Sequence, residues 1–241
     1  NDVSDHVAMQ RSLLQAERLS ALGEIVAGVA HELNNPLTGI LGFAELLLKN
    51  ETDDKKRGRL ESIVAEAMRC QAIVQSLRGF SAKGEAESTF HSINQIVDSM
   101  VTLLEYQMRV DHIDVVRYLD PSEPTVYVDA HSVGRAVLNI VHNAHQALES
   151  VSDRHRRFSV ATEADNNEIR IRFNDNGPGI KPEHLDRIFD PFFTTREFGS
   201  GVGLGLSVAY GAIREHGGRI EVRSTPGEGT EFVIHLPRDT A

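Results

Sequence analysis

The stretch LNIVHNAHQAL, residues 138–148, combines a regular apolar rhythm with two amide side chains one helical turn apart. Its apolar residues continue a pattern that begins upstream at spacings of three and four. This pattern predicts one amphipathic helix over residues 131–150. The stripe that we expect to be buried consists of Val133, Val137, Ile140, Ala144 and Leu148.

The two amides, Asn139 and Asn143, lie on one flank of the stripe, at the boundary between core and solvent. Amides at such a boundary need hydrogen-bonding partners. A Mg²⁺ ion that keeps water and phosphate oxygens as ligands would supply them, and Asn143 is the candidate metal ligand. Alternatively, both asparagines cap the helix or brace a neighbouring loop.

A second stretch, FNDNGPGI (173–180), ends a predicted strand with an acid and two glycines. The Asp175 carboxylate at that strand end can accept a hydrogen bond from an exocyclic amine such as the adenine N6. Gly177 and Gly179 permit a close approach of the backbone. Taken alone, the same residues are also ideal for an ordinary turn.

Two segments further along the chain could handle phosphates. In IFDPFFTTREFG (188–199), Phe189 and its neighbouring phenylalanines could anchor a mobile lid, or only pack its base, and Arg196 could reach a terminal phosphate. In GSGVGLGLSV (199–208), exposed N–H groups before a helix form an anion site. Its glycines are Gly199, Gly201, Gly203 and Gly205. The spacing is neither a P-loop nor a dinucleotide fingerprint.

The remaining pattern of the second half alternates between helix and strand. We expect helices over 92–110 and 204–216, in addition to the one over 131–150, and strands over 112–119, 125–129, 157–164, 168–175, 219–224 and 230–236. The strands 157–164 and 168–175 should form a hairpin. Together these elements predict an α/β sandwich with a mostly antiparallel sheet.

Residues 1–80 are predicted to be helical throughout, with a polar break at 50–59. Each helix carries a one-sided apolar stripe, and two helices alone cannot bury such a face. We therefore expect a homodimer in which two hairpins form a four-helix bundle. The predicted domains are a helical domain over 1–80, a linker over 81–90 and an α/β domain over 91–241, so the fold class is α+β.

The segment VAHELNNPL (29–37) places a histidine beside an acid on the first of these helices. His31 projects about 165° from the centre of the stripe and should face solvent. A neutral imidazole can act as a nucleophile at Nε2 if Glu32 accepts the Nδ1 proton. Asn35, one turn beyond His31, shares its outer face. An outward histidine is, however, usually an ordinary surface residue.

The order of these motifs resembles that of the sensor histidine kinases of two-component systems, over nearly the whole chain. The segment at His31 is similar to their phosphoacceptor box, Asn139 to Asn143 to their N box, and 175–179 to their first glycine box. Residues 189–192 resemble their F box, and 201–206, which ends at Leu206, their second glycine box. The details are closest to the nitrogen-regulatory, PAS-linked branch.

The resemblance implies a Bergerat-type ATP-binding fold for 91–241 and a dimeric phosphotransfer bundle for 1–80. It also implies ATP and Mg²⁺ as ligands, autophosphorylation of His31, and transfer to an aspartate on the receiver domain of a response regulator. For Asn35 it implies a role in dephosphorylating that regulator. The chain departs from the family at Val202, where threonine is common, and at Gln146, where many members carry lysine.

Three other interpretations stay open. Hydrolytic ATPases of the gyrase and chaperone kind share the fold, but they place a glutamate base where Asn139 stands. A non-catalytic scaffold or a phosphatase-only protein is the second. Zinc binding is the third, although HELNN lacks the second histidine of a zinc-protease motif and we expect His142 and His145 to face solvent.

Composition narrows the classes of partner. The 241 residues carry 25 Lys and Arg against 35 Asp and Glu, a net charge of −10, which disfavours nucleic acid and anionic membrane as partners. A single cysteine, Cys70, excludes an internal disulfide. Without a signal peptide or an apolar run of membrane-spanning length, we expect a cytoplasmic fragment. Because the chain starts at Asn1, the full-length protein could still be anchored to a membrane.

Overall fold

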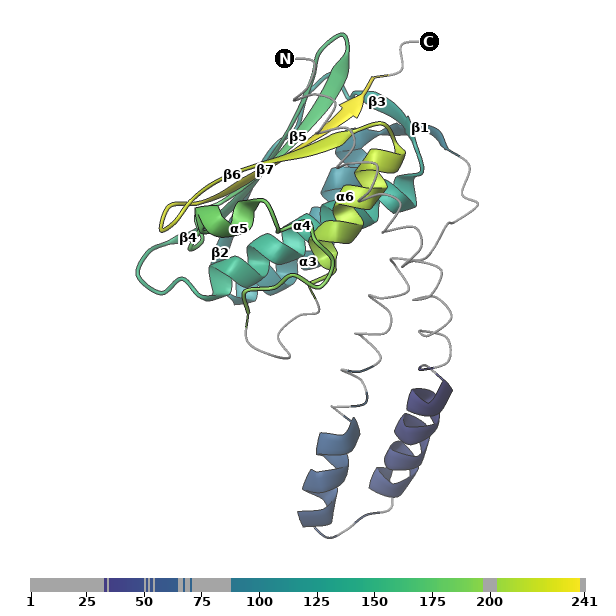
Figure 1. Ribbon diagram of the computed structural model, residues 1–241. Helices are drawn as coiled ribbons and strands as arrows, with labels where there is room; N and C mark the ends of the chain where they lie inside the picture. Colours follow the sequence, from purple (N-terminus) through teal and green to yellow (C-terminus); the bar gives the residue numbers. More distant parts are fainter. Residues whose placement is uncertain are drawn as a thin grey trace. The chain divides into compact units, whose positions relative to one another are not determined.

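The structure is a computed structural model that describes residues 33, 35–49, 51, 53, 55–64, 67, 70, 88–196 and 203–238. The chain divides into two compact units, residues 1–84 and 85–241. Each unit is described by itself below, and Figure 1 shows the elements of both.

The first unit is helical over residues 35–49 and 55–64. The polar break predicted at 50–59 is too long, because the second helix begins at residue 55. Asp53 explains the early start: its Oδ1 accepts hydrogen bonds from the backbone N–H groups of Lys55 and Lys56, at 3.0 and 3.1 Å. Aspartate is among the best residues for capping a helix N-terminus in this way.

Much of the apolar surface of these helices is exposed within one chain. Ala44 is buried, whereas Phe43 and Leu47 are 71% and 61% exposed, and Ile40 and Ile63 are also exposed. A single hairpin thus leaves large apolar side chains in water.

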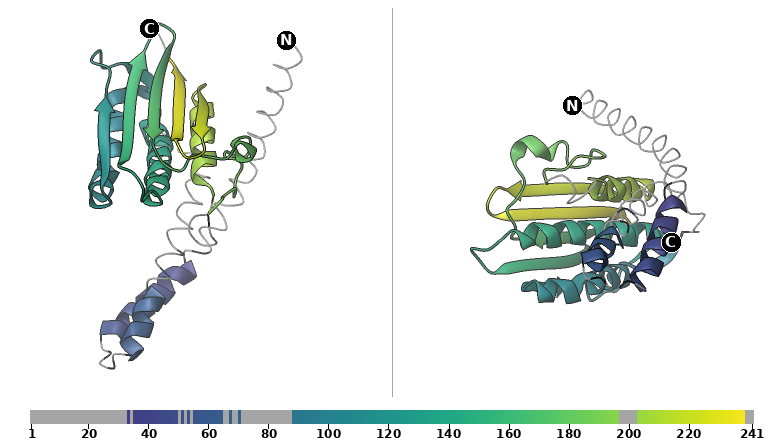
Figure 2. Two further views of the ribbon diagram at one scale, coloured as in Figure 1. Left: turned by 90° about the vertical axis from the view of Figure 1, so that its left-hand side faces the viewer. Right: turned by 90° about the horizontal axis from the view of Figure 1, so that it is seen from below.

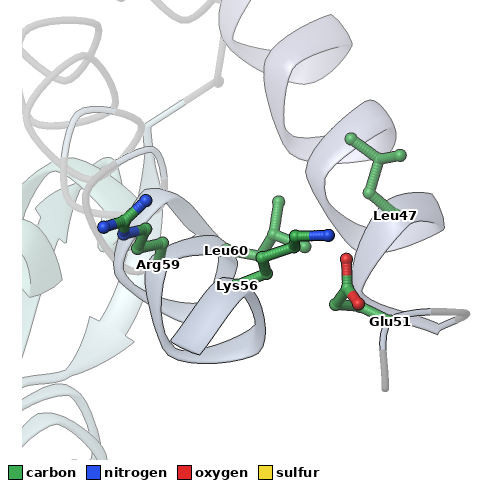
Figure 3. Close-up of a pocket in the computed structure, with 5 residues that line it drawn as sticks. All are labelled: Leu47, Glu51, Lys56, Arg59 and Leu60. Carbon is green, nitrogen blue, oxygen red and sulfur yellow. The ribbon is translucent and has the colours of Figure 1, made fainter. Parts of the chain in front are cut away.

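An open pocket of about 270 Å³ lies between the two helices near the turn (Figure 3). Leu47 and Glu51 line it from the first helix and the residues just after it, and the second helix contributes Lys56, Arg59 and Leu60. None of the predicted nucleotide-site residues borders this pocket. No helix in the described ranges is long and apolar enough to span a membrane.

The second unit contains helices and strands at nearly all of the predicted positions. In chain order the elements are β1 (Thr89–Ser92), α3 (Ile93–Val110), β2 (Ile113–Tyr118), β3 (Thr125–Val128), α4 (Ala130–Glu149), β4 (Arg156–Ala164), β5 (Glu168–Asp175), α5 (Pro182–Leu185), α6 (Gly205–Glu215), β6 (Arg219–Thr225) and β7 (Gly229–Pro237).

The main sheet has five strands in the order β2-β4-β5-β7-β6. The β2–β4 pair is parallel, and β4–β5, β5–β7 and β6–β7 are antiparallel. The prediction of a mostly antiparallel sheet is therefore confirmed, as is the hairpin of β4 and β5. Helices α3, α4 and α6 cover one face of this sheet (Figures 1 and 2).

The core lies between this face of the sheet and the helices. All five residues of the predicted α4 stripe are buried in it, as are Phe158, Phe173 and Phe232 from three neighbouring strands. Burying large apolar side chains at about 25 cal/mol per Å² is the main contribution that holds such a sandwich together. The α+β fold class is confirmed.

Two elements, β1 and α5, were not predicted. β1 pairs with β3 in a separate two-stranded sheet, so Thr89 and Phe90, which the sequence places in the linker, belong to a strand. Ser92 ends β1 and caps α3, since its Oγ accepts from the Gln95 N–H at 3.4 Å. The chain therefore passes from strand to helix without a loop at this point.

Candidate nucleotide site

The middle of α4 meets the beginning of α6. Asn139 and Asn143 are half-buried on α4. A Cβ added to Gly205, the first residue of α6, would lie 3.7 Å from the Asn139 Oδ1. No side chain caps α6, because its N-cap residue is Leu204. The N–H groups of the first turn of α6 are therefore available for an anion beside Asn139.

Asp175 lies at the end of β5, the central strand of the sheet, and is only 5% exposed. The Gly177 N–H donates to its Oδ1 at 2.8 Å, and the Thr230 backbone also donates to the carboxylate. Burial nevertheless raises the pKa of Asp175 to about 6. A neutral N–H donor such as an exocyclic amine would stabilise the ionised form of this carboxylate.

The turn after Asp175 needs both of its predicted glycines. A Cβ at Gly177 would lie 2.7 Å from the Asp175 Oδ1 and 3.3 Å from the Ala147 Cβ on α4. Gly179 has a φ of +72°, and a Cβ there would collide with the Thr225 carbonyl. The turn is thus packed against α4 on one side and the β6–β7 connection on the other.

The aromatic residues after α5 play different structural roles. Phe189 is half-buried, and its ring lies 5.1 Å from that of Tyr210 on α6, so it fixes the base of this segment. Phe193 also packs on the core, with the Arg187 guanidinium 4.6 Å above its ring. Phe192 differs from the prediction of an anchor: it is 50% exposed and has a φ of +65°.

The described end of the second glycine-rich segment, at Gly203, packs against the aromatic segment after α5. Gly203 has a φ of +69°, and a Cβ there would lie 2.5 Å from the Phe193 carbonyl oxygen. Leu206 is half-buried against the core. Arg196 is half-buried as well, and burial lowers the pKa of its guanidinium while the Glu149 carboxylate raises it. A desolvated cation at this position favours an anionic ligand.

One histidine of α4 contradicts the sequence interpretation. His142 is exposed as expected, but His145 is buried, and its Nε2 lies 2.7 Å from the Asp111 Oδ2. This contact joins the end of α3 to α4, and it also holds the pKa of Asp111 below its ordinary value. The helical position of His145 predicts exposure to solvent, because it carries no information on how α3 packs against α4.

Three predicted site residues, His31, Glu32 and Gly201, lie outside the described residues. Asn35 is helical and exposed in the described part of the first unit. Within the second unit, α4 is approached at two places: Gly177, which follows Asp175, lies beside Ala147, and Gly205 lies beside Asn139.

Comparisons with known proteins identify two domain families in the chain. Residues 128–240 match the family described as histidine kinase-, DNA gyrase B- and HSP90-like ATPase, and residues 21–86 match the His Kinase A phosphoacceptor domain. The chain is 34% identical to the signal transduction histidine-protein kinase AtoS of Escherichia coli, over 98% of the chain and 38% of AtoS. It is 35% identical to the sensory histidine kinase/phosphatase NtrB of Vibrio alginolyticus, over 95% of the chain and 66% of NtrB.

Solved structures give the same result. Full-length ShkA in complex with AMPPNP superposes with a TM-score of 0.77 at 25% identity, over 90% of this chain and 46% of ShkA. The histidine kinase ThkA in complex with the response regulator protein TrrA has a TM-score of 0.65 at 29% identity, over 99% of this chain and 68% of that one. The chain spans less than two thirds of the length of the AtoS and NtrB relatives. With both characteristic domains present in order, the chain belongs to the sensor histidine kinases of two-component systems.

Proposed function

We propose that this chain transfers the γ-phosphoryl group of ATP to its own His31, and then to an aspartate on the receiver domain of a response regulator. The observation that carries the proposal is the spacing of the two site ends along α4. Ala147 and Asn139 are eight residues apart, roughly 12 Å along a helix. The acceptor for an amine, Asp175, thus lies near one end of this stretch of α4, and the anion site at the start of α6 lies near the other. The separation suits a nucleotide with its purine at the first and its phosphates at the second.

The predicted site residues of the second unit have separate roles in this proposal. Asp175 accepts a hydrogen bond from the adenine amine. Gly177 and Gly179 allow the tight turn beside Asp175, so that the base can approach the carboxylate closely. Gly203, Gly205 and Leu206 shape the start of α6, where N–H groups meet the phosphates. The glycine-rich run 199–205, including Gly201, would extend this cradle.

The phosphate end also suits Mg²⁺. Asn139 lies beside the start of α6, and Asn143 is half-buried one helical turn further along α4, so both neutral amides would suit an ion that keeps phosphate and water as its other ligands. When bound, the ion would neutralise phosphate charge. Arg196, a desolvated cation, would contact the terminal phosphate, and Phe189 would hold the base of the segment that carries it.

In the transfer itself, the His31 Nε2 lone pair forms the N–P bond while the bond from the γ-phosphorus to the leaving oxygen of ADP breaks. The Nδ1 proton is shared with or passed to Glu32. Positioning and charge neutralisation supply most of the acceleration in phosphoryl transfer. We propose that the linker, shortened to residues 81–88 by strand β1, allows the second unit to approach His31. We also propose that the exposed apolar face of the hairpin pairs with a second copy of the chain.

What the relatives bind supports these assignments. ShkA is known in complex with AMPPNP, and ThkA in complex with TrrA, a response regulator protein. NtrB is named a kinase/phosphatase, which supports a phosphatase activity for this chain as well.

The proposal is tested by incubating the chain with γ-labelled ATP and Mg²⁺. We expect labelled protein whose label is lost in acid and retained in base, as a phosphoramidate requires. We expect little free phosphate, since Asn139 cannot take a proton from water. Rapid release of phosphate without labelled protein would instead identify a hydrolytic ATPase.

Asn35 provides a separate test of the phosphatase activity. An exposed amide four residues after His31 in the sequence could position the water that attacks the phospho-aspartate. Asn35→Ala should leave self-labelling unchanged and slow regulator dephosphorylation about tenfold, the loss of one hydrogen bond of about 1.4 kcal/mol. Thr38→Ala, a neighbouring exposed change, is the control. Equal dephosphorylation rates for Asn35→Ala and the unmodified chain would remove the role.

A further inference from the structure

Arg154, in the connection between α4 and β4, donates hydrogen bonds to three backbone carbonyls. Its Nε donates to the Asn176 oxygen at 3.0 Å, and its Nη2 donates to the Gly177 oxygen at 2.7 Å. Its Nη1 donates to the Gly227 oxygen at 2.5 Å. The first two oxygens belong to the glycine turn after Asp175, and the third belongs to the β6–β7 connection.

One of these carbonyls belongs to the peptide group that orients Asp175. The Asn176 carbonyl and the Gly177 N–H are the two ends of a single planar peptide. The carbonyl end accepts from Arg154 at 3.0 Å, and the N–H end donates to the Asp175 Oδ1 at 2.8 Å. Because the plane is rigid, holding its oxygen fixes the direction of its N–H.

The guanidinium also acts on the strength of that hydrogen bond. A charged donor on the carbonyl polarises the peptide and makes its N–H a better donor to the carboxylate. The Gly177 carbonyl is held by the same guanidinium. Both peptides that flank the Gly177 Cα are thus fixed by a side chain from outside the turn.

We propose that Arg154 is a positioning residue for adenine recognition: it holds the 176–177 peptide so that the Asp175 carboxylate presents its acceptor lone pairs to the 6-amine. The inference rests on the proposed function, in which Asp175 binds adenine. It adds a residue that touches neither the base nor the phosphates, and that sets the selectivity for the amine through the backbone.

Arg156 offers a matched control, two residues further along. It too donates to three carbonyls, those of Val151, Asp111 and Glu149, at 2.7, 2.7 and 3.2 Å. These lie around the ends of α3 and α4, and none belongs to the glycine turn. Replacing Arg156 thus removes the same number of contacts without loosening the peptide that orients Asp175.

The experiment measures binding of two nucleotides to the full 241-residue chain by calorimetry: ATP, and the purine riboside triphosphate that lacks only the 6-amine. For Arg154→Met we expect an affinity for ATP about tenfold weaker, the effect of a lost charge-assisted hydrogen bond. We expect a loss of twofold or less for the analogue. In self-labelling, the KM for ATP should rise with kcat unchanged at saturation. Arg154→Lys should recover part of the affinity for ATP.

Each outcome decides between the alternatives. Equal losses for both nucleotides, or losses matched by Arg156→Met, would overturn the inference and leave Arg154 as a structural clamp. Undiminished ATP affinity in Arg154→Met would overturn it as well. Asp175→Asn distinguishes failure of the proposed function from failure of this inference. If Asp175→Asn leaves the affinity for ATP intact, the assignment of Asp175 to adenine is wrong. If Asp175→Asn weakens ATP binding and Arg154→Met does not, only the role of Arg154 is wrong.

Discussion

Replacing His31 with glutamine is expected to abolish all labelling of the chain by γ-labelled ATP. Glutamine keeps a polar side chain of similar size, but the lone pair of its amide nitrogen is delocalised and cannot attack phosphorus. Affinity for ATP should be unchanged, because the proposed nucleotide contacts all lie in the second unit, residues 85–241. Gel autoradiography after a timed reaction, with calorimetry of ATP binding on the same sample, measures both quantities.

A matched control is available among the other histidines. His131 is exposed in the first turn of α4, and His131→Gln should label as the unmodified chain does. Residual label in His31→Gln with the same stability to acid and base would place the acceptor at another histidine, and the proposed chemistry would then have the wrong nucleophile.

Replacing Asp175 with asparagine should change binding and stability in opposite directions. The substituted amide could turn its NH₂ toward the adenine amine, and we expect the loss of about 2 kcal/mol, or roughly 30-fold, in affinity for ATP. The same change removes a buried charge. Since burial raises the pKa of Asp175 to about 6 from an ordinary 3.8, ionisation costs the folded state about 3 kcal/mol at neutral pH.

The gain in stability should be smaller than this cost. The amide has one acceptor atom where the carboxylate has two, and the lost hydrogen bond reduces the gain by about 1 kcal/mol. We therefore expect the free energy of unfolding to rise by about 2 kcal/mol. The effect has a definite pH dependence. The contribution of Asp175 to the free energy of unfolding is fully present below pH 3.8 and is lost as pH rises through about 6. The difference between variant and unmodified chain should therefore largely disappear at pH 4.

Tyrosine fluorescence during denaturation by urea isolates the relevant unit. All four tyrosines, at positions 106, 118, 127 and 210, lie in residues 85–241, and the chain has no tryptophan. Unfolding at pH 7.5 and pH 4 would give the two free energies. A variant that is less stable at pH 7.5 would contradict the buried, costly carboxylate, and unchanged affinity for ATP would contradict its role in binding adenine.

Periodic patterns in the sequence were sufficient to predict most elements of the second unit. The α4 stripe was predicted residue by residue because a helix that packs on a sheet must repeat its apolar positions every three or four residues. β1 was missed for the opposite reason. It has four residues, and its partner β3 begins 33 residues after β1 ends, so nothing local marks it as a strand.

Long-range polar contacts explain the other differences. His145 is buried because Asp111, 34 residues earlier, lies beside it, and helical position cannot show that. Arg154 reads as one charge in a polar connection until its three carbonyl partners, up to 73 residues away, are in place. An aspartate just before a helical run is a recognised start signal, but the apolar rhythm of the second helix resumes only at Leu60, so the cap at Asp53 was missed.

The position of β5 in the middle of the sheet has a consequence for how a nucleotide would leave. Asp175 ends a strand that is hydrogen-bonded on both sides, to β4 and β7, so opening there requires breaking two ladders at once. The start of α6 depends instead on side-chain packing and on the turn at Gly203. On the proposed assignments, the base would bind where more hydrogen bonds must break before the unit opens, and the phosphates where fewer must break, so we expect release to begin at the phosphate end.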